Sequence, residues 1–543
     1  MKPFTESLTP ASPTMLDAWE ERVRASADAP FLHAFGDTVT FREVDQQADS
    51  LAAALSEHGV ATGDRIAVYT QNDPLFVIGV VAAWKIGAVA VPINPMNTAR
   101  ELRYHLQDSG ANALITLPTL WDDVAAEVVA DSAVGLTVIG GFRRWAPDGE
   151  GIREETVPAD VGTARPAPNG SVLLALEDLP PAEGTAERPA TAASDPALLT
   201  YTSGTTGSPK GAINTHGNIA FNAETYVQMG ALEPGQPILA IAPLFHITVS
   251  VGHLAYGIRA GCPLVLSHRF HPIAVLESIR RWRPVFTIGA ITALMALADF
   301  PELQAGDLSS LEVVYTGGAP VAPSLSERLE TVYGSYIHAA YGMSETASPI
   351  TVGPHGERSP VDPESGSLSV GRAVYDTQLR IVDDAGADLP DGEYGEIWVR
   401  GPQITPGYWE NEEATAEEIT DGGFLHTGDV AFRDAEGWIY LVDRKKDMIN
   451  AAGYKVWPRE VEGVLYDHPA VSEAAVVGTA DDYRGETVAA FVTVKTGQAV
   501  SEEELVAHCR EQLAAYKIPR SIGILDEMPK TATGKIMRRA LRD

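Results

Sequence analysis

The chain has 543 residues, of which 45% are hydrophobic, and it carries a formal net charge of −33. This length and composition exclude an intrinsically disordered protein and allow two or more domains, each with its own core. The acidic balance argues against a general nucleic-acid-binding protein. Two distant cysteines, Cys262 and Cys509, have no metal-ligand or CxxC spacing, which predicts a reduced, cytoplasmic protein.

Strand-like apolar runs alternate with helix-like segments along most of the chain, which favours an α/β architecture. The N-terminus has no apolar signal core. The longest apolar run, residues 75–84, is followed by Lys85 and is too short to cross a bilayer, so we expect a buried helix and no stable membrane insertion. Strands are expected at 66–69, 172–174, 197–199, 238–241, 263–266 and 313–315, and a helix at 272–282.

The last hundred residues predict a smaller unit of mixed type. Residues 474–477 and 488–494 have strand character. Ser501 and Glu504 fit a capping box that opens a helix through Ala514.

Two stretches predict breaks in the chain's organisation. Residues 146–195 are rich in Pro, Gly, Ala and Glu and predict a surface excursion. The charged cluster at 443–447 separates two apolar segments and predicts a domain boundary. We therefore expect a large α/β N-terminal domain of several subdomains, residues 1–445, and a small α+β C-terminal domain, residues 446–543.

The densest chemical signal is the stretch Thr-Tyr-Thr-Ser-Gly-Thr-Thr-Gly-Ser-Pro-Lys-Gly at 200–211, which follows the expected strand at 197–199. Its glycines free the backbone to bend and to expose N–H groups, and Lys210 adds positive charge. Hydroxyl groups come from Thr202, Ser203, Thr205 and Thr206. These groups suit a polyphosphate, although the spacing is not that of a Walker A loop. Composition alone leaves an ordinary Ser/Gly-rich turn as the alternative.

This stretch strongly resembles the phosphate loop of the adenylate-forming superfamily, which includes acyl-CoA synthetases, nonribosomal peptide adenylation domains and beetle-type luciferases. Further motifs follow in the family's order almost to the C-terminus. The resemblance implies that a carboxylic acid is activated with ATP and Mg²⁺ as an acyl-adenylate, and that the C-terminal domain is a mobile lid. It assigns nucleotide binding to Thr202, Ser203, Gly204, Thr205, Thr206, Gly207, Lys210, Gly318, Ala319, Pro320, Tyr341, Gly342, Met343, Asp429 and Arg444.

The motif Tyr-Gly-Met-Ser-Glu-Thr at 341–346 looks like the family's second core motif. The resemblance implies that Glu345 holds Mg²⁺, with Thr202 completing the protein ligands, and that Thr346 touches the α-phosphate. One carboxylate is enough, because Mg²⁺ takes hard oxygen ligands together with substrate phosphates. Outside this motif a lone Glu would more simply be a solvated surface residue.

The resemblance places His246, Gly317 and Gly342 at the acyl pocket, and His246 is also a catalytic candidate as the gate between this pocket and the CoA tunnel. An absent side chain at Gly317 is expected to leave room for an alkyl tunnel; the alternative is a glycine required only by the backbone. For His246 the alternative is a purely structural residue. Amino-acid-activating relatives usually carry Asp at the position of His246, so an α-amino acid substrate is not expected.

Two motifs after residue 420 resemble the family's ribose and hinge motifs. In the motif at 424–429, Asp429 is implied to accept hydrogen bonds from both ribose hydroxyls. In the charged cluster at 443–447, Arg444 is implied to contact ribose or phosphate, and Lys446 is the implied pivot. Without the resemblance this charge run would be a solvated loop.

The segment Pro-Lys-Thr-Ala-Thr-Gly-Lys at 529–535 resembles the family's C-terminal catalytic motif. Lys535 is implied to bridge the acyl carboxylate and the α-phosphate, which is electrostatic catalysis by a compact cation. Between the two half-reactions the lid is implied to rotate, which brings Gly453, Tyr454 and Lys455 toward CoA. Without the resemblance the segment would be a polar tail.

The motifs together predict an ATP-dependent acyl-CoA synthetase. Residues 94–97 and 100–102 resemble the medium- and long-chain fatty acid branch, while aryl acids remain open. Only eight residues follow Lys535, so no carrier domain is expected. The alternatives are an adenylating enzyme that passes the acyl group to a carrier protein or an amine, and a non-catalytic nucleotide-binding scaffold. The oligomeric state is open, with a homodimer as one option.

Overall fold

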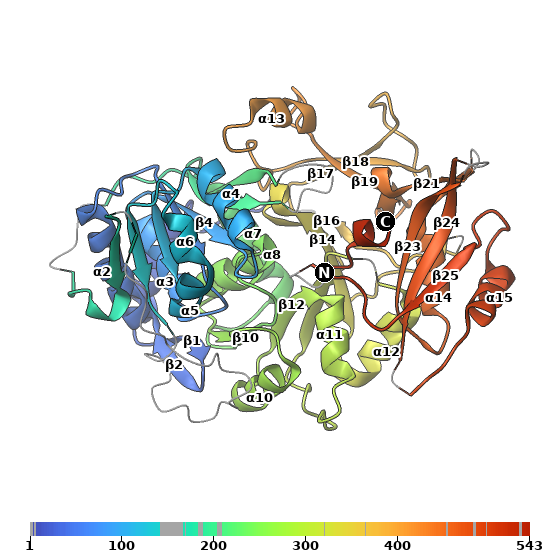
Figure 1. Cartoon of the computed structure of the whole chain (residues 1–543), viewed down its shortest axis with the longest axis horizontal. Coiled ribbons are helices and arrows are strands. Elements are labelled where there is room, and N and C mark those ends of the chain that lie inside the picture. The colour runs from blue at the N-terminus through green and yellow to red at the C-terminus, as the bar shows by residue number, and fades with distance from the viewer. Residues whose placement is uncertain are drawn as a thin grey trace.

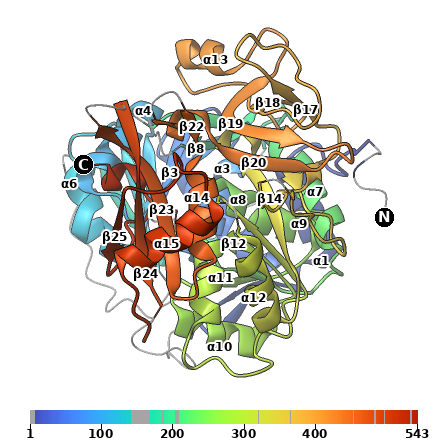
Figure 2. The ribbon, with the colours of Figure 1, turned by 90° about the vertical axis from the view of Figure 1, so that its right-hand side faces the viewer.

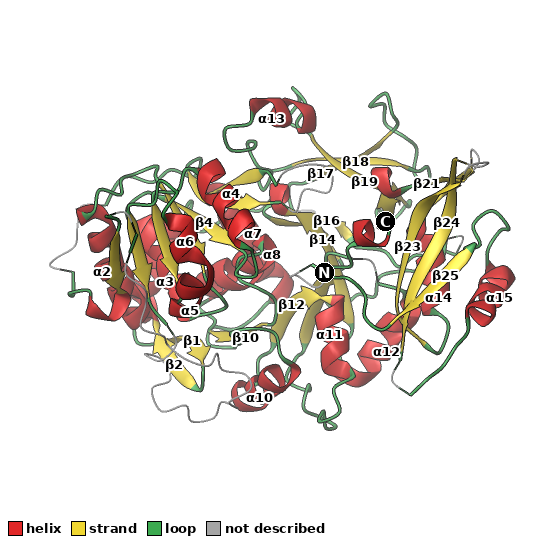
Figure 3. Cartoon of the chain, viewed as in Figure 1, coloured by secondary structure: helices red, strands yellow, loops and turns green. Residues whose placement is uncertain are grey.

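The structure is a computed structural model (Figure 1). It describes residues 4, 7–141, 167–168, 170–182, 188–202, 209–319, 321–363, 365–451, 454–481, 485–495, 497–531 and 535–542. Within these ranges the chain forms four β-sheets with helices packed between and around them, as Figure 3 shows. The predicted α/β fold, with a large N-terminal part and a smaller C-terminal part, is confirmed.

The first sheet has seven strands and is parallel except at β8–β9. Its order is β7 (Val172–Ala175), β6 (Leu136–Ile139), β5 (Ala113–Thr116), β3 (Arg65–Tyr69), β4 (Val89–Ile93), β8 (Pro196–Tyr201) and β9 (Gly211–Thr215). The central strands are buried on both faces, as expected of a parallel sheet covered by helices. The strands expected at 66–69, 172–174 and 197–199 are confirmed; most of the excursion predicted at 146–195 lies outside the described residues.

The expected buried helix is α3 (Pro74–Lys85), in which every residue is buried. Asp73 caps its N-terminus by accepting a hydrogen bond from the Leu75 N–H. At the other end the Lys85 ammonium lies 2.5 Å from carboxylate oxygens of both Asp45 and Asp49 on α2 (Phe41–Glu57). The charge is therefore paired, which permits a lysine at the end of a buried apolar helix. In the part of the chain that the structure describes, no helix combines the length and the apolar character needed to span a membrane.

The second sheet has nine strands. Its order is β16 (Arg372–Ala373), β15 (Ser348–Val352), β14 (Ile337–Met343), β13 (Val313–Gly317), β12 (Phe286–Ala290), β10 (Ile238–Ala240), β11 (Leu264–Leu266), β1 (Pro30–Ala34) and β2 (Asp37–Thr40). Because apolar side chains alternate between two faces, the sheet needs cover on both sides. The expected strands at 238–241, 263–266 and 313–315 are confirmed.

Helices fill the space between the two large sheets and cover their outer faces. The shared inner layer is α1 (Met15–Ser26), α2, α3, α7 (His216–Gly230) and α9 (Tyr256–Ala260), and one apolar core runs through it into both sheets. The outer faces carry α4 (Ala99–Ser109) and α6 (Ala126–Val129) on the first sheet, and α10 (Pro272–Trp282), α11 (Ile291–Ala298) and α12 (Pro323–Tyr333) on the second. The helix expected at 272–282 is therefore confirmed.

An antiparallel sheet of four strands follows the second large sheet. It consists of β17 (Gln378–Val382), β18 (Gly395–Arg400), β19 (Leu425–Arg433) and β20 (Ile439–Arg444), with α13 (Glu412–Glu418) before β19. Its core also contains Tyr341 of β14, so β14 joins two sheets. β20 ends two residues before the predicted pivot.

The C-terminal unit is an α+β sheet that faces the viewer in Figure 2. Its elements are β21 (Ile449–Ala451), β22 (Tyr454–Val456), α14 (Pro458–Tyr466), β23 (Val471–Asp481), β24 (Gly485–Val494), α15 (Glu502–Gln512) and β25 (Ser521–Leu525). The predicted capping box of Ser501 and Glu504 is confirmed. The helix ends before Ala514, because Leu513 turns extended and enters the core. The boundary at 445/446 stays a prediction.

Candidate active site

Lys535 of the C-terminal unit reaches the end of strand β13 in the N-terminal part. A Cβ placed on Gly318 would lie 2.7 Å from Lys535 Cε, closer than real side chains approach. Gly318 also has φ +84°, a conformation that favours glycine. The backbone conformation therefore favours glycine at this position, and the end of the flexible Lys535 side chain packs against it. The lysine predicted to be catalytic therefore lies against the loop predicted to bind adenine.

The Lys535 ammonium is surrounded by charges of both signs. Burial lowers its pKa, and the positive charges of Arg444 and Arg459 add to this effect, while Asp429 and Glu345 oppose it. Predicted site residues that lie far apart in the sequence therefore come together in space. A desolvated cation in this position attracts an anionic substrate group more strongly than an exposed lysine would.

Asp429 lies in β19 and is only 7% exposed. The Tyr341 hydroxyl donates to its Oδ2 at 2.7 Å, and Arg444 Nε lies 3.4 Å from its Oδ1. Burial, followed by the Asp429 charge, raises the pKa of Tyr341, so the phenol keeps its proton. Tyr341 and Arg444 thus hold the Asp429 carboxylate, which is predicted to accept hydrogen bonds from the ribose hydroxyls.

Glu345 sits at the tip of the β14–β15 hairpin, in the short 3₁₀ turn η6 (Ser344–Thr346), and is 5% exposed. The Tyr408 hydroxyl donates to its Oε1 at 2.8 Å, and burial raises the pKa of the Glu345 carboxyl. No Lys, Arg or His in the described ranges forms an ion pair with it. A buried carboxylate with a spare oxygen and no paired cation is a chemically suitable ligand for a hard metal ion.

The hydroxyl of Thr346 is enclosed within the hairpin turn. Thr346 is fully buried, and its Oγ1 contacts Met343 N, Met343 O and Ser348 O. This hydroxyl closes the hairpin turn, and the α-phosphate contact of Thr346 stays a prediction. Ser344 is half-buried, and its hydroxyl has no hydrogen-bond partner among the described residues.

His246 follows β10 and caps the short helix α8 (Ile247–Val249), where its Nδ1 accepts a hydrogen bond from Thr248 N at 3.3 Å. Burial and the nearby Lys535 charge lower the pKa of His246 to about 3. The imidazole is therefore neutral at physiological pH. The proximity of His246 to Lys535 agrees with a position beside the predicted reaction centre. Its hydrogen bond to Thr248 N also stabilises the start of α8, so His246 has a structural role as well.

The described ends of the phosphate loop are joined by a hydrogen bond from Thr202 N to Lys210 O. Lys210 Nζ lies 3.5 Å from Glu418 and stands over the ring of Tyr408, whose hydroxyl holds Glu345. Sequence reasoning missed Tyr408, because its Pro-Gly-Tyr-Trp setting gives no local chemical signal. The loop residues Ser203, Gly204, Thr205, Thr206 and Gly207 lie outside the described residues.

The two glycines predicted at the acyl pocket both meet backbone. A Cβ on Gly317 would lie 2.8 Å from the Ala340 carbonyl oxygen, and one on Gly342 only 1.8 Å from the Ser348 carbonyl oxygen. Close approach of neighbouring strands therefore requires glycine at both positions. Their contact with an acyl group remains a prediction.

The remaining predicted residues are distributed along the edges of the site. Ala319 is exposed beside Gly318, and Met343 is half-buried at the end of β14. Lys455 is exposed on β22 and is absent from the charges that act on Lys535. Pro320, Gly453 and the side chains of Lys446 and Tyr454 lie outside the described part of the chain.

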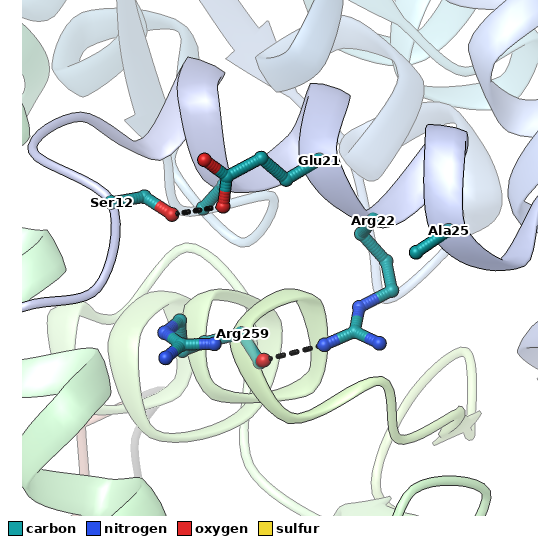
Figure 4. Close-up of a pocket in the computed structure, with 6 residues that line it drawn as sticks. Ser12, Glu21, Arg22, Ala25 and Arg259 are labelled. Atoms are coloured by element: carbon teal, nitrogen blue, oxygen red, sulfur yellow. Dashed lines mark hydrogen bonds between the residues drawn. The ribbon is translucent and has the colours of Figure 1, made fainter.

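A separate hollow of about 200 Å³ lies between α1 and α9 (Figure 4). Its polar side chains are already engaged: Ser12 donates to Glu21, and Arg22 donates to the carbonyl groups of Ile258 and Arg259. Arg22 thereby caps the C-terminus of α9. This hollow is a packing feature rather than a second candidate site.

The geometry can be compared with known protein families. A family model described as "AMP-binding enzyme" matches residues 19–409, and one described as "AMP-binding enzyme C-terminal domain" matches residues 460–535. The chain belongs to the AMP-binding enzyme family. The prediction of an acyl-CoA synthetase is therefore confirmed as to family and enzyme class.

Individual proteins of known name align with nearly the whole length of this chain. A long-chain-fatty-acid–CoA ligase of Bacillus subtilis (strain 168) is 35% identical over 93% of this chain and 90% of its own length. A feruloyl-CoA synthase of Amycolatopsis sp. is 35% identical over 97% of this chain and 98% of its own length. A solved anthranilate CoA ligase in complex with anthranoyl-AMP superposes with a TM-score of 0.84 at 28% identity, covering 98% of this chain and 97% of that one.

Proposed function

We propose that this AMP-binding enzyme activates a fatty acid with ATP and transfers the acyl group to CoA. A carboxylate oxygen attacks the α-phosphorus and releases pyrophosphate; the CoA thiol then attacks the acyl carbonyl, loses its proton and releases AMP. The observation that carries the proposal is Lys535, which lies against Gly318 with Asp429 and Glu345 close enough to act on its charge.

The chain's own residues supply the first half-reaction. The Lys535 ammonium neutralises the repulsion between the acyl carboxylate and the α-phosphate and stabilises the charge that develops between them. Asp429, held by Tyr341, accepts hydrogen bonds from the ribose hydroxyls and so orients the nucleotide. His246 is neutral in this setting, so we assign it a steric role at the acyl pocket rather than proton transfer.

Glu345, with Thr202, would hold the magnesium ion. When bound, that ion neutralises the phosphates of ATP and favours departure of pyrophosphate. We assign the α-phosphate contact to the hydroxyl of Ser344, which has no hydrogen-bond partner among the described residues, in place of Thr346, whose hydroxyl is engaged in the turn. A reducing compartment such as the cytoplasm is proposed from Cys262 and Cys509, which are both buried free thiols.

A panel of acids tests the substrate. Pyrophosphate release is measured with C4 to C16 fatty acids, benzoate, anthranilate and ferulate, each with and without CoA, and products are searched for a thioester. We expect the highest kcat/KM for a medium or long fatty acid, because each buried methylene contributes about 0.8 kcal/mol. Highest activity with an aryl acid would reject the fatty acid, and turnover without thioester would reject the CoA acceptor.

Chain-length selectivity is best measured on the unaltered protein. Substitution of Gly317 does not test an alkyl tunnel cleanly, because even Gly317→Ala would press on the Ala340 carbonyl oxygen. A uniform loss across acids in that variant would then report backbone displacement and not pocket depth.

A further inference from the structure

The turn that carries Glu345 is held in an unfavourable backbone conformation. Ala347 and Ser348, which follow Glu345 closely, have φ +44° and +93° although neither is glycine. Two successive residues of this kind are costly and persist only where the surroundings hold them. The strands on either side are also forced together, since a Cβ on Gly342 would lie 1.8 Å from the Ser348 carbonyl oxygen.

Three fully buried side chains, here called the turn clamp, hold this hairpin: Asn214 of β9 and Asn222 and Tyr226 of α7. Asn222 Nδ2 donates to Ala347 O at 2.8 Å, with Thr346 O at 3.0 Å and Pro349 O at 3.4 Å. Asn214 and Tyr226 contact the turn residues on either side: Asn214 Nδ2 lies 2.8 Å from Ser344 O, and the Tyr226 hydroxyl lies 2.8 Å from Ser348 Oγ.

The amide oxygen of Asn222 indicates which group of this side chain positions the turn. Its Oδ1 is buried and has no hydrogen-bond partner among the described residues. Leaving a buried acceptor unsatisfied is unfavourable, so an amide that served only to fill space would be a poor choice here. The side chain is instead placed by its N–H groups, which face three carbonyl oxygens of the strained turn.

We propose that Asn222 is a positioning residue for Glu345: it holds the left-handed turn closed so that the carboxylate stays beside Tyr408 and close to Lys535. Loss of its N–H groups lets Ala347 and Ser348 relax, which opens the hairpin and displaces Glu345. The inference rests on the proposed function, in which Glu345 holds magnesium. The defect is therefore confined to the half-reaction that uses ATP and Mg²⁺.

The test compares Asn222→Ala and Asn222→Asp with the control Thr225→Ala, on the same helix. Thr225 is fully buried, and among the described residues its hydroxyl bonds only to Phe221 O of its own helix. Two quantities are measured: the Mg²⁺ concentration for half-maximal protection by ATP against thermal unfolding, and the rate of thioester formation from supplied acyl-adenylate. We expect the Mg²⁺ requirement to rise about 10- to 100-fold in both Asn222 variants, as for other partners of metal ligands, with thioester formation nearly unchanged.

Asn222→Asp should be the more severe variant at neutral pH. It keeps the shape and the Oδ1 atom but replaces the donor with a second acceptor that faces three carbonyl oxygens. Tyr226→Phe is a milder variant that removes only the hydroxyl contact to Ser348, and it should raise the Mg²⁺ requirement less. Its control is Tyr315→Phe, since Tyr315 is equally buried and its hydroxyl contacts Gly353 O outside the turn.

A second substitution separates backbone strain from loss of packing. Glycine adopts positive φ without strain, so Ala347→Gly should return the Mg²⁺ requirement of Asn222→Ala toward the original value. A packing defect around position 222 would not be repaired by a change at 347. Recovery in the double variant therefore supports the clamp.

Three outcomes count against the inference. An unchanged Mg²⁺ requirement in Asn222→Ala, Asn222→Asp and Tyr226→Phe would overturn it, as would equal losses in both half-reactions without repair by Ala347→Gly. If the unaltered protein shows neither Mg²⁺-dependent protection by ATP nor acid-dependent pyrophosphate release, the proposed function fails, and this role of Asn222 fails with it.

Discussion

In the proposed reaction, Lys535 supplies the positive charge for the first half-reaction. Lys535→Ala should lower acyl-adenylate formation about 10²- to 10³-fold, because the ammonium acts on charge that develops only in that step. Thioester formation from supplied acyl-adenylate should remain. The control is Lys530→Ala, since Lys530 is close in the sequence but pairs with Glu473. Equal losses in both half-reactions would remove the role from Lys535.

Ser344 and Thr346 can be distinguished by their hydroxyl groups. Ser344→Ala should raise the KM for ATP with little change in thermal stability, because its hydroxyl has no hydrogen-bond partner to lose within the described part of the chain. Thr346→Val should mainly lower stability, by about 1–3 kcal/mol, because it leaves buried groups of the turn unpaired. Thermal unfolding and ATP kinetics of both variants provide the measurement; the reverse pattern would restore the phosphate contact to Thr346.

At the scale of elements, Arg538 ties the segment that bears Lys535 to the predicted hinge. Its guanidinium makes hydrogen bonds to Glu462 at 2.8 and 2.9 Å and lies 3.4 Å from Asp443 and 3.5 Å from Asp447. Asp443 is fully buried in β20 and precedes the predicted pivot, Lys446, in the sequence. Glu462 lies on α14 and follows the pivot. The contact between Arg538 and Asp443 therefore crosses the hinge.

Arg538→Ala should slow adenylation by up to about 10²-fold through misplacement of Lys535, and slow thioester formation less. Arg542→Ala is the matched control, because the ion pair that Arg542 forms within the described residues is to Asp447, on the same side of the pivot. Rapid-quench measurement of the two half-reactions checks the difference. Identical effects of the two variants would show that the contact across the hinge has no special role.

At the scale of the whole molecule, the proposed reaction requires the C-terminal unit to rotate after adenylation. Lys446→Pro should leave acyl-adenylate formation near normal and impair thioester formation, because proline fixes φ where a pivot must change its backbone. The control is Lys445→Pro, one residue nearer β20. Retention of both half-reactions in Lys446→Pro would place the pivot elsewhere.

The stability of the whole molecule should fall on acidification. Burial lowers the pKa of five enclosed histidines to about 3 or 4: His33, His216, His253, His268 and His338. In the unfolded chain these groups bind protons near pH 6.5, so unfolding takes up protons below that pH and stability decreases as pH falls toward 4. Asp73, whose pKa burial raises to about 7, acts in the opposite direction as a single group.

Urea unfolding at pH 7.5 and 5.5 measures this effect. We expect a lower midpoint at pH 5.5, and a smaller difference in His253→Phe, since each buried histidine contributes up to about 1.4 kcal/mol per pH unit. His58→Gln, at an exposed position, serves as the control. A midpoint independent of pH would contradict the prediction.

The sequence by itself determined the elements whose signals are local. The apolar run that became α3, the Ser501–Glu504 capping box and the alternation of strands and helices depend on neighbouring residues, so a linear pattern contains them. The order of the family motifs likewise predicts Lys535, Asp429 and Glu345 as site residues, and the structure places them close together.

Only the tertiary structure decided how those residues are held. Tyr341 reaches Asp429 across 88 residues, Tyr408 reaches Glu345 across 63, and Asn222 reaches Ala347 across 125. Such contacts are set by how the sheets and α7 pack together, and no local pattern encodes that packing. The strain at Ala347 and the burial of the Thr346 hydroxyl follow from the same cause, which is why the sequence alone indicated neither that the threonine closes the turn nor that the asparagine holds it.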